Sequence, residues 1–191
     1  MLKRRTLLTR CCGALGLCGG SLLLRDSAWA QEGAPAPETA AALPGAQTTG
    51  SARMRFFGLA IYDATLWVAP GFRAATYAQH ALALELTYQR ALSGRAIAER
   101  SLHEMRRAAS LAPEQEARWL AAMQEAFPDV NAGDRITGLH TPGVGARFWF
   151  NGHARPPLPD AEFSRLFFGI WLADTTSEPA MRRALLARAN P

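Results

Sequence analysis

The sequence predicts an α+β fold with a largely antiparallel sheet. Strand-like patterns gather early and in the middle of the chain, helical patterns come in blocks, and strand and helix do not alternate regularly. Residues 84–107 carry the clearest signal, because an alternating strand pattern changes at Ser93 to the 3.6-residue period of an amphipathic helix. We expect a ligand site where this helix packs on its own sheet.

Residues 1–30 are typical of a secretory signal peptide. A positively charged segment that ends at Arg10 precedes an apolar run over residues 11–24, and Ala28-Trp29-Ala30 is a small-x-small site, so cleavage is expected after Ala30. The pair Arg4-Arg5 with the leucines after it also fits a twin-arginine signal, so Sec and Tat export both remain open. The mature protein is expected in the periplasm or outside the cell.

Removal of this leader changes the charge and the cysteine content. It takes away five of 21 Lys and Arg and one of 16 Asp and Glu, which leaves 16 basic and 15 acidic residues and a net charge of +1. The basic pI is therefore largely a property of the leader, and no nucleic-acid partner is predicted. All three cysteines lie in the leader, and the four histidines lack metal-ligand spacing, so we predict neither a metal nor another cofactor.

The first half of the mature chain contains a linker, strands and one helix. Residues 31–50 are rich in Ala, Pro, Gly and Thr without apolar periodicity, and we expect a disordered linker there, with one folded domain over 51–191. Residues 53–68 are dense in aromatic and β-branched residues, and Gly58 suggests a bulge or bend between two strand segments. A short helical connector over 74–79 leads to a strand over 82–88 and to the helix that Ser93 caps.

The second half contains a hairpin between blocks of helices. Pro113 begins a second amphipathic helix, and Pro128 ends it. Residues 134–140 and 146–151 are predicted to pair around Thr-Pro-Gly-Val-Gly. Asp160 caps a strongly apolar helix over 161–172, and a last helix is expected over 178–189. We expect a monomer with no membrane span after signal cleavage.

Arginines beside aromatic residues are the best candidates for ligand binding. Arg55 alternates with aromatic and apolar neighbours on its strand, and Arg100 lies at the boundary of the helical apolar stripe. A guanidinium at the edge of an aromatic cleft is a good receptor for a carboxylate or phenolate. The alternative is that these arginines pair with nearby carboxylates and face water. Tyr62 and Tyr88 could donate a hydroxyl to the same ligand or to a structural partner.

Several long segments resemble the bacterial chalcone isomerase-like proteins over about residues 50–186. They are Phe57-Gly-Leu-Ala-Ile-Tyr-Asp-Ala-Thr-Leu-Trp67, Ile97-Ala-Glu-Arg-Ser-Leu-His-Glu-Met-Arg106, Phe127-Pro-Asp-Val-Asn-Ala-Gly-Asp134 and the helix from Phe163 to Trp171. The resemblance implies an open-faced sandwich, in which a large antiparallel sheet is covered by a layer of helices. Plant enzymes of this superfamily cyclise chalcones in a cleft between sheet and helices, and other relatives bind fatty acids.

The chain departs from the plant enzymes where they carry their chemistry. The matching helix has Glu99-Arg100-Ser101 in place of an acid-Asn-Cys triplet, the region of the plant tyrosine reads Ala91-Leu-Ser-Gly-Arg-Ala96, and the plant threonine falls on Phe57. A ring closure needs a polarised carbonyl and an ordered phenolate, which Phe57 cannot supply.

Our leading interpretation is an exported, non-catalytic protein that binds a small amphipathic molecule such as a fatty acid. The ligand-binding residues predicted are Arg55, Phe57, Tyr62, Trp67, Tyr88 and Arg100, with Phe56 and Ile61 also beside the acyl tail. The runner-up is an intramolecular lyase or isomerase acting on a phenolic substrate. A third interpretation is an envelope interaction module whose arginine-rich face meets an acidic partner.

Overall fold

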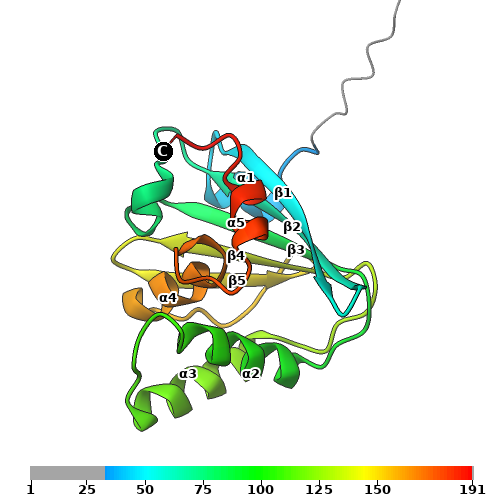
Figure 1. Cartoon of the computed structure of the whole chain (residues 1–191), viewed down its shortest axis with the longest axis vertical. Coiled ribbons are helices and arrows are strands. Elements are labelled where there is room, and N and C mark those ends of the chain that lie inside the picture. Colours follow the sequence, from blue (N-terminus) through cyan, green and yellow to red (C-terminus); the bar gives the residue numbers. More distant parts are fainter. Residues whose placement is uncertain (1–32, 191) are drawn as a thin grey trace, which may run out of the picture. The chain divides into compact units, whose positions relative to one another are not determined.

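The computed structural model describes residues 33–190 (Figure 1). The proposed signal peptide and its cleavage site lie outside the described residues. No helix in residues 33–190 combines the length and apolarity needed to cross a bilayer. The elements, in chain order, are α1 (Pro37–Ala42), β1 (Gln47–Phe56), β2 (Leu59–Val68), the 3₁₀ helix η1 (Ala74–Gln79), β3 (Leu82–Tyr88), α2 (Gly94–Met105), α3 (Pro113–Ala126), β4 (Arg135–Thr141), β5 (Gly145–Phe150), β6 (His153–Ala154), α4 (Ala161–Leu172) and α5 (Pro179–Leu185).

The sheet has six strands, and each pairs antiparallel with its neighbours in the sequence, in the order β1-β2-β3-β4-β5-β6. The helices come in two blocks, α2 with α3 between β3 and β4, and α4 with α5 after β6. In Figure 1, α2 and α3 lie side by side at the bottom of the view, and α4 and α5 lie in front of the sheet. The predicted α+β class with an antiparallel sheet is confirmed.

The β1–β2 connection differs from the expected bend. Phe57 and Gly58 form a two-residue turn in which both residues have positive φ, 47° and 79°, as in the type I′ turns that suit the twist of a hairpin. The bulge lies in β2 instead, because Met54 pairs with Tyr62 and Arg55 with Ala60, leaving Ile61 unopposed. An extra residue shifts the alternation by one position, so Ile61 and Tyr62 reach the same face of the sheet.

The helix-covered face of the sheet carries the main core. Leu66, Leu84 and Phe148 from the sheet pack with Phe163 and Phe168 of α4, and each of these side chains is at most 2% exposed. The predicted caps hold these helices in place. Ser93 accepts a hydrogen bond from the amide of Ala96 (3.2 Å), and Asp160 from that of Phe163 (2.9 Å).

The segment predicted as a disordered linker is ordered from residue 33, so that prediction is wrong for most of the segment. It forms α1, which packs on the other face of the sheet, and the first residues of β1. A β3 carboxylate, Glu85, accepts from the amide of Ala36 (2.9 Å) and the hydroxyl of Thr39 (2.7 Å). These polar anchors belong to a distant strand, which explains why local composition gave no sign of them.

A second anchor fixes α1 to β4. The buried carboxylate of Glu38 accepts hydrogen bonds from the hydroxyl of Thr137 (2.8 Å) and the guanidinium of Arg135 (3.0 Å). Burial raises the pKa of Glu38, but a backbone hydrogen bond at Glu38 and the bonds from Thr137 and Arg135 together bring it below its usual value.

The last helix is shorter than predicted and ends at Leu185 rather than at residue 189. Beyond Leu185 the backbone forms hydrogen bonds to other segments instead of continuing the helix. The amide of Arg188 donates to the carbonyl of Thr49 on β1 (3.0 Å), and the carbonyl of Asn190 accepts from Ala74 (3.0 Å).

His140 is a buried neutral histidine of the core, 1% exposed. Its Nε2 lies 3.0 Å from the carbonyl oxygen of Ala78, which can only accept, so Nε2 carries the proton and Nδ1 accepts from the Ser164 hydroxyl at 2.6 Å. Burial lowers the pKa of His140 below its ordinary value of 6.5.

We expect this histidine to make folding sensitive to mild acid. Because the pKa of His140 is lower in the folded protein, the unfolded chain binds more protons below the ordinary value of 6.5. The free energy of unfolding is therefore highest above that pH and decreases as the pH drops below it. Urea denaturation of the mature protein at about pH 7.5 and about pH 5.5 measures the effect; the carboxylates with lowered pKa titrate below this range.

His140→Gln should reduce the difference in stability between the two pH values. His103→Gln, on the exposed face of α2, is the matched control and should keep it. Equal pH dependence in the wild type and His140→Gln would contradict this assignment.

Candidate ligand pocket

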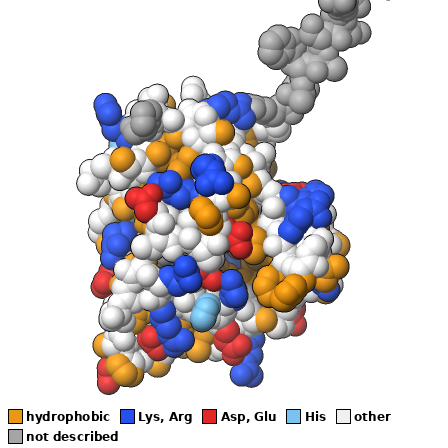
Figure 2. Space-filling model, viewed as in Figure 1, with side chains coloured by type: hydrophobic (Ala, Val, Ile, Leu, Met, Phe, Trp, Pro, Cys, Tyr) orange, Lys and Arg blue, Asp and Glu red, His pale blue; other side chains and the backbone are white. Residues whose placement is uncertain are grey.

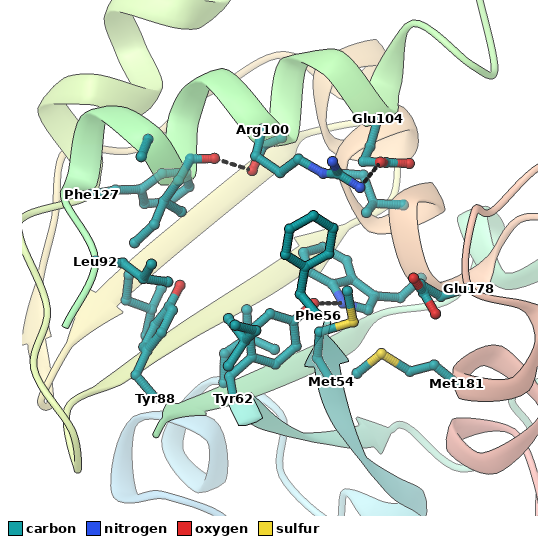
Figure 3. A pocket seen from close by; sticks show the side chains of 18 of the residues that line it. Met54, Phe56, Tyr62, Tyr88, Leu92, Arg100, Glu104, Phe127, Glu178 and Met181 are labelled. Carbon is teal, nitrogen blue, oxygen red and sulfur yellow. Dashed lines mark hydrogen bonds and ion pairs between the residues drawn. The ribbon is translucent and has the colours of Figure 1, made fainter. Parts of the chain in front are cut away.

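A cavity of about 320 Å³ lies between the hairpin end of the sheet and the helices (Figure 3). Its size falls within the range of small-molecule sites, roughly 300–1,000 Å³. Strands β1 to β4, helices α2 and α4, the end of α3 and the segment that enters α5 contribute the walls. The lining residues are Met54, Phe56, Ile61, Tyr62, Leu86, Tyr88, Leu92, Ala96, Ile97, Arg100, Ser101, Glu104, Phe127, Ile136, Phe167, Ile170, Trp171, Ser177, Glu178 and Met181.

The floor of the pocket is set by strand alternation. Tyr62 and Tyr88 are directly paired across β2 and β3, and both point toward the helices with ring centroids 5.9 Å apart. The β2 bulge adds Ile61 to the same floor. Apolar and aromatic side chains of α2 and α4 form the opposite wall, so most of the surface suits a hydrocarbon or an aromatic ring.

Tyr62 is held in place by a neighbour in the wall. Its hydroxyl accepts a hydrogen bond from the Trp171 indole nitrogen at 3.1 Å. Burial raises the pKa of Tyr62 to about 12, so the phenol stays protonated at neutral pH and keeps its own proton to donate.

Tyr88 carries a hydroxyl that no described residue satisfies. The side chain is 2% exposed, and none of the hydrogen bonds among residues 33–190 includes its hydroxyl. In Figure 3 the hydroxyl points from β3 toward α2, into the pocket. Burial raises the pKa of Tyr88, so this group is a protonated donor and not a base. The hydroxyl faces the open space of the pocket, where a ligand oxygen could accept its proton without displacing a protein partner.

The charged end of the pocket contains one arginine and two carboxylates. Arg100 forms an i,i+4 ion pair with Glu104 at 2.6 Å, and Arg107 approaches the other oxygen of Glu104 at 3.7 Å. The Glu104 side chain is 7% exposed and that of Arg100 is 55% exposed, so the carboxylate faces inward while the guanidinium reaches the mouth. Glu178 lies across the pocket from this pair (Figure 3).

Three of the six predicted ligand-binding residues meet in this pocket: Tyr62, Tyr88 and Arg100. Phe56 and Ile61, predicted beside the acyl tail, line it as well. The alternative that Arg100 pairs with a nearby carboxylate is confirmed by its ion pair with Glu104, and its side chain is 55% exposed. Its position on the pocket wall leaves ligand binding by this arginine a prediction.

The other three predicted residues lie outside the pocket. Arg55 sits on the opposite face of β1 from Met54 and Phe56, and its guanidinium donates to the carbonyl of Gly58 at 3.3 Å. Phe57 occupies the hairpin turn, where its side chain is 91% exposed. Neither side chain can reach the cavity from these positions.

Trp67 faces the other side of the sheet because it stands at odd spacing from Tyr62 on β2. It packs with Leu43, Ala83 and Leu139 in the small core beneath α1 and is 5% exposed. Its indole nitrogen has no hydrogen-bond partner among the described residues.

Sequence reasoning missed several residues that matter here. Glu104 was not singled out from the sequence, yet its side chain is 7% exposed and lines the pocket. Trp171 and Phe127 were assigned to helix cores without reference to a pocket, and Glu178 to a helix start. Each enters the pocket through tertiary packing, for which no local signal exists. Residues 33–190 contain no group of His, Cys, Asp and Glu side chains able to hold a metal ion.

Comparisons with known proteins agree with this fold. The sequence model of the chalcone isomerase-like family matches residues 47–187. Among solved structures, a fatty-acid binding protein of Arabidopsis thaliana is similar, with a TM-score of 0.58 at 10% sequence identity over 75% of this chain and 87% of that protein. At that identity the likeness establishes the shared fold. A search of curated proteins found no match.

Replacing each tyrosine by phenylalanine should change the free energy of unfolding by different amounts. Tyr88→Phe removes a hydroxyl without a protein partner, so we expect the free energy of unfolding to stay within about 0.5 kcal/mol or to rise. Tyr62→Phe leaves the Trp171 N–H unpaired and should cost about 1–3 kcal/mol. Urea denaturation of both variants tests this, and a larger loss in Tyr88→Phe than in Tyr62→Phe would show that the Tyr88 hydroxyl has a structural partner.

Proposed function

The chain belongs to the chalcone isomerase-like family, and on that premise we propose that it is a non-catalytic protein that binds a small amphipathic molecule such as a fatty acid. The observation that carries the proposal is the mainly apolar cavity with an unsatisfied donor, the Tyr88 hydroxyl, inside it. The similar Arabidopsis protein is named as a fatty-acid binding protein, which supports the same class of ligand here.

The walls favour an acyl chain for the apolar part of the ligand. Met54, Met181 and Ile170 offer flexible or branched aliphatic surface, and Phe127 and Phe167 close the inner side. Burial of hydrocarbon contributes about 25 cal/mol per Å² of apolar surface removed from water, so a chain that occupied this cavity would supply most of the binding free energy.

Two groups can bind the polar head. The Tyr88 hydroxyl can donate to a carboxylate or carbonyl oxygen deep in the pocket. Arg100 at the mouth has five N–H donors, of which the bond to Glu104 uses only part, so it can hold a second carboxylate. Glu104 and Glu178 oppose an anionic head, and the charge of Glu104 is offset by its ion pairs with Arg100 and Arg107.

One observation favours the alternative function, an intramolecular lyase or isomerase. The protonated Tyr88 hydroxyl could polarise the carbonyl of a phenolic substrate, as an intramolecular lyase or isomerase would require. Against this, the Ser101 hydroxyl is already bonded to the carbonyl of Ile97 at 2.8 Å, and the Phe57 side chain lies in solvent. Turnover in the chalcone absorbance assay that Tyr88→Phe abolishes would favour the enzyme.

We further propose that the protein is exported and acts in the periplasm or outside the cell. The supporting features are the charged start, apolar run and small-x-small site of residues 1–30. N-terminal sequencing of protein from the envelope fraction would read Gln31 first if cleavage follows Ala30, and a cytoplasmic protein that retains Met1 would contradict export.

Fatty acids should stabilise the mature protein, and blocking the mouth should abolish this effect. Ala96 lines the pocket yet is exposed on α2, so Ala96→Trp places an indole across the entrance without filling the core. At a concentration 100 times the Kd, a ligand adds about 2.7 kcal/mol to the free energy of unfolding. We expect palmitate to raise the melting temperature of the wild type but not of Ala96→Trp.

Ala117→Trp on the exposed side of α3 is the matched control and should respond as the wild type does. Lipid extraction and mass spectrometry of the purified protein provide an independent measurement. The proposal is contradicted if the purified protein carries no lipid and its melting temperature does not rise when fatty acids of several lengths are added.

Charge substitutions on α2 should reveal the head group. Glu104→Gln releases Arg100 from its ion pair and should tighten binding of a fatty acid about 3- to 10-fold, whereas Arg100→Gln should weaken it by a similar factor. Glu99→Gln breaks the exposed pair with Arg95 one turn earlier, outside the pocket, and should leave the Kd unchanged. Isothermal titration measures all three; tighter binding by Arg100→Gln would mean that the head group is not an anion.

A further inference from the structure

We propose that the β1–β2 hairpin end docks on the surface of a lipid bilayer that contains anionic phospholipids. The docking tip is defined as Phe56, Phe57 and Leu59, with Arg55 and Arg90 beside it. Figure 2 shows hydrophobic side chains gathered over the hairpin end of β1 and β2, at the right of the view, with basic side chains above them. The proposal concerns an outer surface and goes beyond the pocket.

The apolar part of the tip stands out among residues 33–190. Phe56, Phe57 and Leu59 are 51%, 91% and 54% exposed, and the remaining large exposed hydrophobic residue of this part of the chain is Val144. Val144 lies in the β4–β5 turn at the opposite end of the sheet, as the strand register shows. Exposed apolar side chains scattered singly are ordinary, but three together at one tip indicate an interaction surface.

The conformation of Phe57 is unfavourable for its residue type. It has a φ of 47°, in the left-handed region, at a turn position that usually holds Asn, Asp or Gly. Within residues 33–190 its aromatic contact is with Phe56, with ring centroids 4.5 Å apart, so core packing does not explain a phenylalanine here. A strained, exposed aromatic residue is consistent with a functional role outside the folded core.

The charges beside the tip favour an anionic surface. Arg53 is bound to Asp63 and Arg95 to Glu99, so these arginines are neutralised locally. Arg55 and Arg90 are also exposed, and neither forms an ion pair with a carboxylate in residues 33–190, although Arg55 lies near enough to Asp63 to help lower the pKa of that carboxyl. The hydrogen bond from the Gln89 amide to the Ile61 carbonyl, 2.8 Å, places the end of β3 with Arg90 beside the hairpin. Guanidinium groups that flank an apolar tip fit phosphate head groups above acyl chains.

The tip is continuous with the pocket. Phe56 is both an exposed residue of the tip and part of the pocket wall, and Ile61 follows on the next strand. If the pocket binds fatty acids as proposed above, a docked tip would let an acyl chain pass between bilayer and pocket without crossing water. The docking itself does not require that function, and the two can be tested separately.

The test is co-sedimentation of the mature protein with vesicles of phosphatidylglycerol and phosphatidylcholine in roughly equal parts, compared with phosphatidylcholine alone. We expect binding to the anionic vesicles that weakens as salt is raised. Phe57→Asn creates the Asn-Gly pair that a type I′ turn prefers, so it should keep or raise the melting temperature. The same variant should reduce vesicle binding about tenfold or more.

Two further variants complete the design. Val144→Asn removes an exposed apolar side chain at the far end of the sheet and should bind vesicles as the wild type does. Arg55→Gln combined with Arg90→Gln should abolish the preference for anionic vesicles without lowering the melting temperature. Because Phe57 does not line the pocket, Phe57→Asn should bind palmitate in solution normally, which separates failure of docking from failure of the pocket.

The proposal is overturned if the wild type does not sediment with anionic vesicles, or if Phe57→Asn sediments as well as the wild type. It is also overturned if light scattering shows a concentration-dependent dimer that Phe57→Asn disrupts while vesicle binding is absent. In that case the tip is an interface between two copies of the chain.

Discussion

The packing of α4 against the sheet is the constraint on which the rest of the structure depends. Phe167 contacts both Phe163 and Phe168, and Phe163 and Phe167 reach Phe148 on β5, so the helix-covered face is filled beneath β4 and β5. Toward β1 to β3 the same face carries Tyr62, Tyr88 and Leu86, and α2 spans them without filling the space. The pocket is therefore the part of the interlayer space that the aromatic side chains of α4 do not reach.

The two faces of the sheet and its hairpin end have different structural roles. One face forms the core and the pocket floor. The other face fixes the N-terminal segment through Glu38 and Glu85, each a carboxylate held by hydrogen bonds from partners far away in the sequence. The hairpin end contributes Phe56 to the pocket wall, whereas its Phe57 is 91% exposed and belongs to neither core. The bulge at Ile61 links this end to the pocket, because it turns one more apolar side chain inward beside the tip.

Local patterns predicted most elements, since caps, periodicity and turn residues act over a few residues. Ser93 and Asp160 cap their helices as expected, and the 134–151 hairpin has the predicted strands. The order of residues 33–50 was not predictable, because their hydrogen-bond partners lie on β3 and β4. Of the predicted site residues, Tyr62, Tyr88 and Arg100 line the pocket and the other three do not. Tyr62 and Trp67 were placed in one cleft although odd spacing on a strand sends them to opposite faces, and the inward position of Glu104 depends on the helices packed over it.

If the cavity between sheet and helices holds an amphipathic ligand, as proposed, the methyl groups of the methionines in its wall must lie close to the bound chain. Met54 and Met181 line the pocket, whereas Met105 and Met123 are buried in the core and are not part of its lining. With methyl-labelled methionine and ¹³C-labelled palmitate, we expect nuclear Overhauser contacts from the acyl chain to Met54 and Met181 and none to Met105 or Met123. Contacts to none of the four methyl groups at saturating palmitate, or to the two core methionines alone, would contradict the proposal.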